Sequence, residues 1–98
     1  MNLFTEEIRK ALPHLYSTKR TFDPVAHAKF FTPWTNWTWH VTEFDGEDTF
    51  FGLVVGFEKE FGYFSLSELE SIRGPRSLKI ERDLDFTPTR LNELTGTD

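Results

Sequence analysis

The N-terminal pattern predicts a short helix and then a connecting segment. Thr5 can cap the first free N–H groups of a helix, and the two glutamates after it suit the positive end of the helix dipole. Ile8 and Leu12 lie four residues apart, on one face of that helix. Because Pro13 disfavours the helical conformation at the residue before it, the helix is expected to end there. The chain from Pro13 to Pro24 is predicted to be a surface connection.

Two strands are predicted next. Residues 25–31 form the first, although alanines blur its alternation. In the second, Trp37, Trp39 and Val41 alternate with polar residues, which is the period of a strand with two different faces. We therefore expect the face that carries Trp37 and Trp39 to be part of the core.

A hairpin is predicted around the acidic turn at residues 45–48. The following strand, 50–57, pairs back on the tryptophan strand, and residues 61–64 add a short further strand. The side chains expected to face the core are Leu53, Val55 and Phe57. Gly52 and Gly56 fall on the other side, where a bulge or a close neighbour is expected.

The second half of the chain predicts a capped helix and an extended end. Ser65 to Glu70 offers a capping box in either of two registers, and Gly74 with Pro75 ends the helix. The buried stripe of this helix consists of Leu66, Leu69 and Ile72. Residues 78–86 alternate as an extended segment, and Thr87 with Pro88 begins a last helical turn.

Together these elements predict an α+β fold. The expected architecture is a small antiparallel meander of three to four strands with two short helices packed on one face. The length of 98 residues corresponds to one domain, 1–98, with residues 1–4 and 95–98 frayed.

Composition narrows the class of protein. Hydrophobic residues make up only 38% of the chain but aromatic residues 16%, so that burial comes in few, large side chains. There is no cysteine, which excludes disulfides and thiolate metal sites. His14, His27 and His40 lack the spacing of a metal site, and no cofactor is expected. Without a signal peptide or an apolar run long enough for a membrane span, the expected location is the cytoplasm.

Four segments of the chain carry a family resemblance: FFTPWTNWTWHVTEFD, FFGLVVGFE, EFGYFSLSELESIRGP and IERDLDF. From about Leu3 to Leu94 the chain resembles domain-of-unknown-function family 2958, small bacterial proteins often met on plasmids and integrated mobile elements. The matching motif residues are Pro33, Trp34, Asn36, Trp37, Trp39, Glu43, Gly52, Gly56, Gly62, Tyr63, Phe64 and Glu68. The chain departs from the pattern at Thr35, where glycine is frequent, and at His40, where tyrosine is. The resemblance implies a mobile-element setting and no catalytic residue.

Negative charge is concentrated in the predicted hairpin and second helix. Residues 43–70 hold eight acids and one lysine, a local charge of −7. Such a region is either a solvated rim that keeps the protein soluble or a face for a protein with a basic surface. Trp34 and Asn36, in the proline-bounded loop before the tryptophan strand, are possible anchors. The predicted partner-binding residues are Trp34, Asn36, Glu43, Asp45, Glu58, Glu60, Glu68 and Glu70.

A second hypothesis is binding of single-stranded nucleic acid. Trp34 could stack on a base, and basic side chains recur every three residues in the segment 73–82. The residues of this alternative site are Trp34, Arg73, Arg76, Lys79 and Arg82. Neighbouring acids favour structural pairing of these cations, and the net charge of −5 argues against general duplex binding. With no nucleophile elbow, phosphate loop or dinucleotide fingerprint, no enzyme is predicted, and protein–protein recognition is the favoured function.

Overall fold

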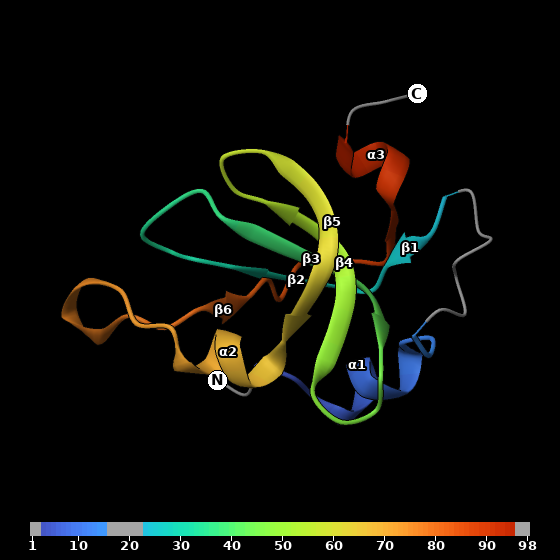
Figure 1. Cartoon of the computed structure of the whole chain (residues 1–98), viewed down its shortest axis with the longest axis horizontal. Coiled ribbons are helices and arrows are strands. Elements are labelled where there is room, and N and C mark those ends of the chain that lie inside the picture. The colour runs from blue at the N-terminus through green and yellow to red at the C-terminus, as the bar shows by residue number, and fades with distance from the viewer. Residues whose placement is uncertain (1–2, 16–22, 96–98) are drawn as a thin grey trace.

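The computed structural model describes residues 3–15 and 23–95 (Figure 1). In chain order the elements are α1 (Glu6–Ala11), β1 (Val25–Ala26), β2 (Ala28–Phe31), β3 (Thr38–Phe44), β4 (Thr49–Val55), β5 (Lys59–Ser65), α2 (Leu66–Ser71), the 3-10 turn η1 (Pro75–Ser77), β6 (Glu81–Arg82), β7 (Thr89–Arg90) and α3 (Leu91–Thr95). An antiparallel sheet has the strand order β5-β4-β3-β2-β6, and β1 pairs with β7. The α+β class is confirmed, with a larger sheet than the predicted three to four strands. The predicted connection from Pro13 to Pro24 lies largely outside the described residues.

The predicted first strand is interrupted at His27. Its backbone N–H donates to the carbonyl of Val41 at 2.8 Å, but the residues on either side pair with different strands. Ala26 pairs with Thr89 of β7, whereas Ala28 pairs with Val41 of β3. One apolar segment therefore joins the sheet to the C-terminal end of the chain.

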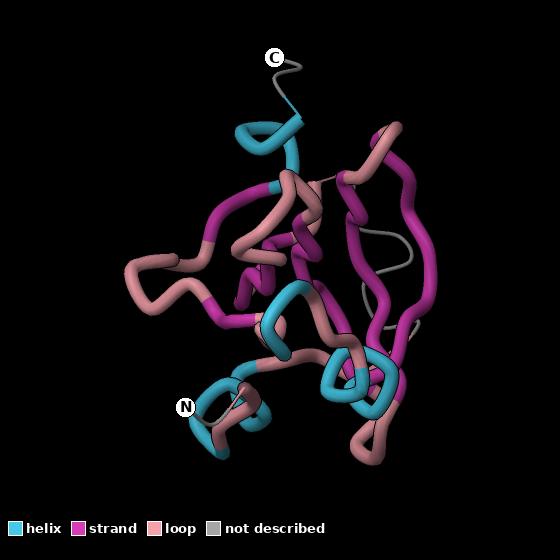
Figure 2. The backbone as a smooth tube through the Cα atoms, turned by 90° about the vertical axis from the view of Figure 1, so that its left-hand side faces the viewer, coloured by secondary structure: helices cyan, strands magenta, loops and turns pink. Residues whose placement is uncertain are grey.

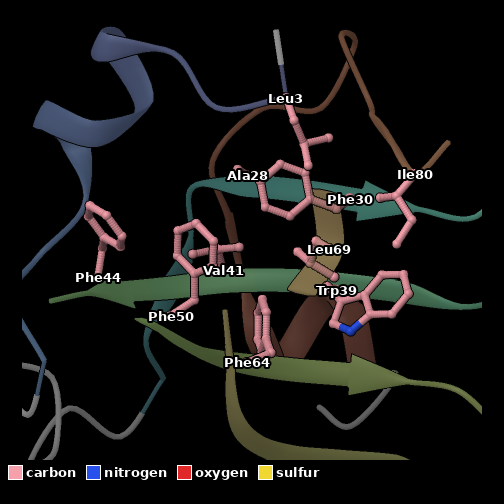
Figure 3. Close-up of a cluster of buried hydrophobic side chains, with 10 residues drawn as sticks. All are labelled: Leu3, Ala28, Phe30, Trp39, Val41, Phe44, Phe50, Phe64, Leu69 and Ile80. Carbon is pink, nitrogen blue, oxygen red and sulfur yellow. The ribbon is translucent and has the colours of Figure 1, made fainter. Parts of the chain in front are cut away.

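The main core lies on one face of the sheet, under α1 and α2 (Figure 3). Its buried residues are Leu3, Ala28, Phe30, Trp39, Val41, Phe44, Phe50, Phe64, Leu69 and Ile80. Phe50 is fully buried and its ring lies 5.5 Å from that of Phe64 and 5.2 Å from that of Phe4. Leu3 is also buried, so the prediction of a frayed N-terminus is wrong for Leu3 and Phe4, which pack into the core.

The other face of the sheet carries a smaller core under α3. Leu53 is 1% exposed and packs with Ala26 and Leu91, and Val55, Phe86 and Leu94 border this cluster. In both views α3 stands at the other end of the molecule from α1 and α2 (Figures 1 and 2). The helices therefore cover both faces, because the last apolar turn of the chain packs against the side of β4 that α1 and α2 leave open.

The predicted inward face of β4 needs two corrections. Leu53 is buried, but on the smaller core, while Phe50 and Val54 on the opposite side of the strand pack in or against the main core. Phe57 is 96% exposed, so its predicted core position is wrong. The reason is that β4 ends at Val55, which places Phe57 in the turn.

Local capping sets the position of α2 as predicted. The hydroxyl of Ser65 accepts the N–H of Glu68 at 3.1 Å, which is the N-cap bond of the predicted capping box, and donates to the carboxylate of Glu68 at 2.8 Å. Asp48 accepts the N–H of Ser67 at 2.9 Å, which ties the start of α2 to the β3–β4 turn.

Candidate functional site

The turn between β4 and β5 is built around a tryptophan that lies on a glycine. A Cβ on Gly56 would come within 2.5 Å of Cη2 of Trp37, so only glycine lets the indole lie against the backbone there. Trp37 in turn contacts Phe57, with ring centroids 5.7 Å apart and ring planes at 84°. The close neighbour that was expected at Gly56 is therefore confirmed, and it is an aromatic ring.

Beside these two rings lies an open pocket of about 250 Å³. Its lining consists of Trp37, Val54, Gly56, Phe57, Glu58 and Glu60. Glu58 and Glu60 are exposed and belong to the turn and to the start of β5, whereas Trp37 is half-buried against the main core. The pocket thus combines a fixed aromatic wall with two carboxylates that remain open to solvent.

This combination suits a positively charged side chain. The face of an aromatic ring carries negative electrostatic potential and attracts an ammonium or guanidinium group. The carboxylates of Glu58 and Glu60 add charge complementarity for the same group, and guanidinium can also bond a carboxylate in a bidentate manner. A lysine or arginine side chain of a partner fits this chemistry.

Glu43 does not belong to an exposed acidic face. The β3–β4 register shifts between Val41 and Glu43, and Glu43 is 3% exposed. The next residue, Phe44, donates its N–H to the carbonyl of Pro13, so the chain after α1 passes beside this end of β3. The prediction that Glu43 contacts a partner directly is wrong because the residue is buried.

The remaining predicted acids lie at the two ends of the β4 hairpins. Asp45 accepts the N–H groups of Glu47, Asp48 and Thr49 at 2.8, 2.9 and 3.0 Å. These bonds lower the pKa of Asp45, and the bond from Glu47 has the largest effect. At the same end the carboxylate of Glu68 accepts the hydroxyl of Ser65, and Glu70 is exposed. Glu58 and Glu60 lie at the other end of β4, so the acidic region divides into a turn-and-cap group and the pocket group.

Trp34 packs into the molecule. It is half-buried against the main core, and a Cβ on Gly74 would lie 2.4 Å from its ring, so one face of the indole is covered by that glycine. Asn36 is exposed in the same loop. Neither residue lines the pocket, whereas Trp37, which was predicted as core only, does. The signal in the sequence that could have indicated the pocket is Phe57, an aromatic residue at the start of the charged stretch FEKEF.

The four basic residues of the alternative site do not form one ridge. Arg73 donates to the carbonyls of Glu70 and Ile72 at the end of α2, at 2.5 and 3.0 Å, as suits a helix C-terminus. Arg82 donates to the carbonyl of Leu3 at 3.1 Å. Arg76 and Lys79 are exposed on the loop between them. The structure therefore places Arg73, Arg76 and Lys79 around one loop and Arg82 apart from them.

The three histidines lie on different segments: His14 follows α1, His27 stands between β1 and β2, and His40 belongs to β3. Burial, and to a smaller extent the charge of Lys29, lowers the pKa of His40 to about 4, and burial lowers the pKa of His27. The Nε2 atom of His40 lies 3.3 Å from the hydroxyl of Thr38. Within residues 3–15 and 23–95, no group of three or more histidine, aspartate or glutamate side chains could hold a metal ion.

A larger groove, of about 490 Å³, runs between α1 and the segment around β6. Its charged lining residues are Glu6, Glu7, Arg82 and Asp83. The hydroxyl of Thr5, which also lines it, already accepts the N–H of Ile8 as a helix cap. Phe86 contributes an aromatic ring to the lining, but Arg82 stands among the acids here. The groove is therefore less selective for a cation than the pocket beside Trp37, whose charged lining residues are both acidic.

The fold and site define a small α+β protein with a sheet covered on both faces and an aromatic pocket flanked by carboxylates. The chain belongs to the family described as "Protein of unknown function (DUF2958)", whose model matches residues 3–94, and the family resemblance is thereby confirmed. No curated protein and no solved structure matches the chain. No helix of the described residues is long and apolar enough to cross a membrane.

Proposed function

We propose that the protein is a non-catalytic binding protein that recognises a protein partner with a basic surface. The observation that carries the proposal is the pocket in which Trp37 and Phe57 stand beside Glu58 and Glu60. An aromatic ring that is 96% exposed in a turn contributes little to the fold, which favours a role in contact with another molecule. The partner is proposed to insert a lysine or arginine side chain into this pocket.

Location and setting are part of the same proposal. The net charge of −5 favours association with a basic protein over a nucleic acid. We place the protein in the bacterial cytoplasm, in the maintenance or transfer of a mobile element or in its contest with host defence. The family resemblance supports that setting, and the pocket supplies the chemistry of the contact.

Binding of single-stranded nucleic acid is the weaker candidate. Trp34 has one indole face covered by Gly74, and Arg73 is engaged at the end of α2. Stacking on a base needs an accessible ring face close to free cations. At the other pocket, the exposed ring is that of Phe57, and it stands beside two acids, which favour a basic side chain over a phosphate.

The test is a titration with peptides that contain several arginines or lysines, followed by tryptophan emission, to which Trp37 in the pocket contributes. Saturable quenching is expected for the natural chain, and it should be lost when Phe57→Ala or the pair Glu58→Gln and Glu60→Gln is introduced. The matched control is Glu6→Gln with Glu7→Gln, which removes the same charge from the exposed start of α1. Equal losses in both double variants, or no quenching of the natural chain, would overturn the proposal.

A second arm of the test separates the two classes of partner. A single-stranded oligonucleotide is titrated under the same conditions, with Arg76→Gln and Lys79→Gln as the variant. Saturable binding of the oligonucleotide that needs Arg76 and Lys79 but not Phe57 would put nucleic acid in place of the basic protein. Binding of the basic peptide that depends on Phe57, with no saturable binding of the oligonucleotide, supports the pocket as the site of a basic side chain.

A further inference from the structure

The outer edge of β5 is an open strand of seven residues. The opposite edge of the sheet is β6, which is only two residues long and so offers little to an added strand. Within the part of the chain that the structure describes, no strand pairs with the outer side of β5. Long exposed edge strands attract other strands and are normally covered, charged or interrupted. β5 contains no proline, and its central residue, Gly62, has open space around it.

The edge also presents aromatic side chains on the face away from the main core. Phe61 is 58% exposed and Tyr63 is 56% exposed. Both contact Phe51 on β4, with ring centroids 6.4 Å and 5.0 Å away, respectively. Three aromatic rings thus form a continuous apolar strip that ends at the open edge.

We propose that this edge pairs with β5 of a second copy of the chain, antiparallel and centred on Gly62. In that register Phe61 of one copy stands opposite Tyr63 of the other, twice, by the two-fold symmetry. The aromatic strip then continues from Phe51 of one copy, across both β5 strands, to Phe51 of the other. Registers centred on Phe61 or Tyr63 give one aromatic pair in place of two.

Charge complementarity favours the same register. Lys59 lies opposite Ser65 of the second copy, whose hydroxyl donates to the carboxylate of Glu68 at 2.8 Å. The ammonium group of Lys59 therefore meets a carboxylate at each end of the pair. No two like charges stand opposite each other, since Glu60 faces Phe64 and Gly62 faces Gly62. A second copy therefore matches both the aromatic strip and the charges of this edge.

The chain allows a direct test because it contains no cysteine. In Gly62→Cys the new side chain enters open space, so the fold is retained, and the two thiols meet across the symmetry axis only in the proposed register. Under mild oxidation this variant is expected to form a disulfide-linked dimer about tenfold or more faster than Glu47→Cys, since pairing raises the effective concentration of the thiols. Glu47 is an exposed residue of the β3–β4 turn and serves as the matched control.

Sedimentation of the unmodified chain completes the test. The natural chain is expected to be dimeric and Phe61→Glu monomeric, while Phe57→Glu, whose residue lies outside β5, stays dimeric. A monomeric natural chain, or a dimer that survives Phe61→Glu, overturns the proposal, as does cross-linking of Gly62→Cys no faster than of Glu47→Cys. Glu60 belongs both to the pocket and to β5. The two proposals still fail separately, because Phe57 and Glu58 act in the pocket and take no part in the strand pairing, whereas Phe61 and Gly62 take part in the pairing and do not line the pocket.

Discussion

Trp37 lies against Gly56 at a distance that only a residue without a side chain permits. A Cβ at position 56 would come within 2.6 Å of three atoms of the indole ring. The same indole packs against Phe57 and lines the pocket that we propose for a basic side chain. The glycine therefore connects the stability of the hairpin with the shape of the site.

Gly56→Ala is expected to lower the free energy of unfolding by about 1–3 kcal/mol, because the methyl group overpacks the turn and displaces Trp37. Denaturant unfolding measures this change. Gly62→Ala is the matched control, since a Cβ there has no neighbour within 4 Å. Equal losses in the two variants would contradict the explanation from the indole contact.

Asp45 holds the β3–β4 turn through three backbone N–H groups. Asp45→Ala is expected to lower the free energy of unfolding by about 1–2 kcal/mol, as for the loss of a capping acceptor. Asp45→Asn should retain part of that stability. Because the folded state lowers the pKa of Asp45, its contribution is present above the ordinary carboxyl pKa and is lost as the pH falls through the lowered value. Thermal unfolding of both variants checks this, and Glu47→Ala, in the same turn, should be nearly neutral.

Local signals in the sequence were enough to predict several parts of this fold. Thr5 caps α1 and Ser65 caps α2 through the N–H of Glu68, as their spacing indicates. Trp39 and Val41 are buried on one face of β3, as the alternation predicts. Each of these features depends on residues within a few positions of one another, which is the range over which sequence patterns are informative.

The features that the sequence did not reveal depend on contacts between distant segments. The bulge that buries Glu43 arises from the register between β3 and β4. The placement of α3 on the far side of the sheet depends on β1 pairing with β7. The pocket joins Trp37 to a turn twenty positions later, so neither segment alone indicates a site. The loop position of Trp34 left its exposure open, because the residue that packs on it is forty positions away: Gly74 covers one face of its ring.

Stability is expected to fall between neutral and mildly acidic pH because of His40. The pKa of His40 is about 4 in the folded chain, against the ordinary value of 6.5 in the unfolded chain. The unfolded chain therefore takes up the proton first as the pH falls. This lowers the free energy of unfolding by roughly 3 kcal/mol between pH 7 and pH 4. Chemical unfolding across this range should show the slope, and His40→Gln should reduce it. The smaller remaining slope has the same sign, because burial also lowers the pKa of His27. An unchanged slope in His40→Gln would rule out this origin.

The last prediction separates binding from folding within one aromatic group. Trp39 is 8% exposed in the main core, so Trp39→Ala is expected to lower the free energy of unfolding by about 3–5 kcal/mol. Phe57 is 96% exposed, and Phe57→Ala is expected to change the free energy of unfolding by no more than about 0.5 kcal/mol. Unfolding curves of the two variants measure these values, and the peptide titration measures the binding that Phe57→Ala should remove. A large loss of stability in Phe57→Ala would mean that the exposed ring supports the turn, and the case for a binding role of Phe57 would then fail.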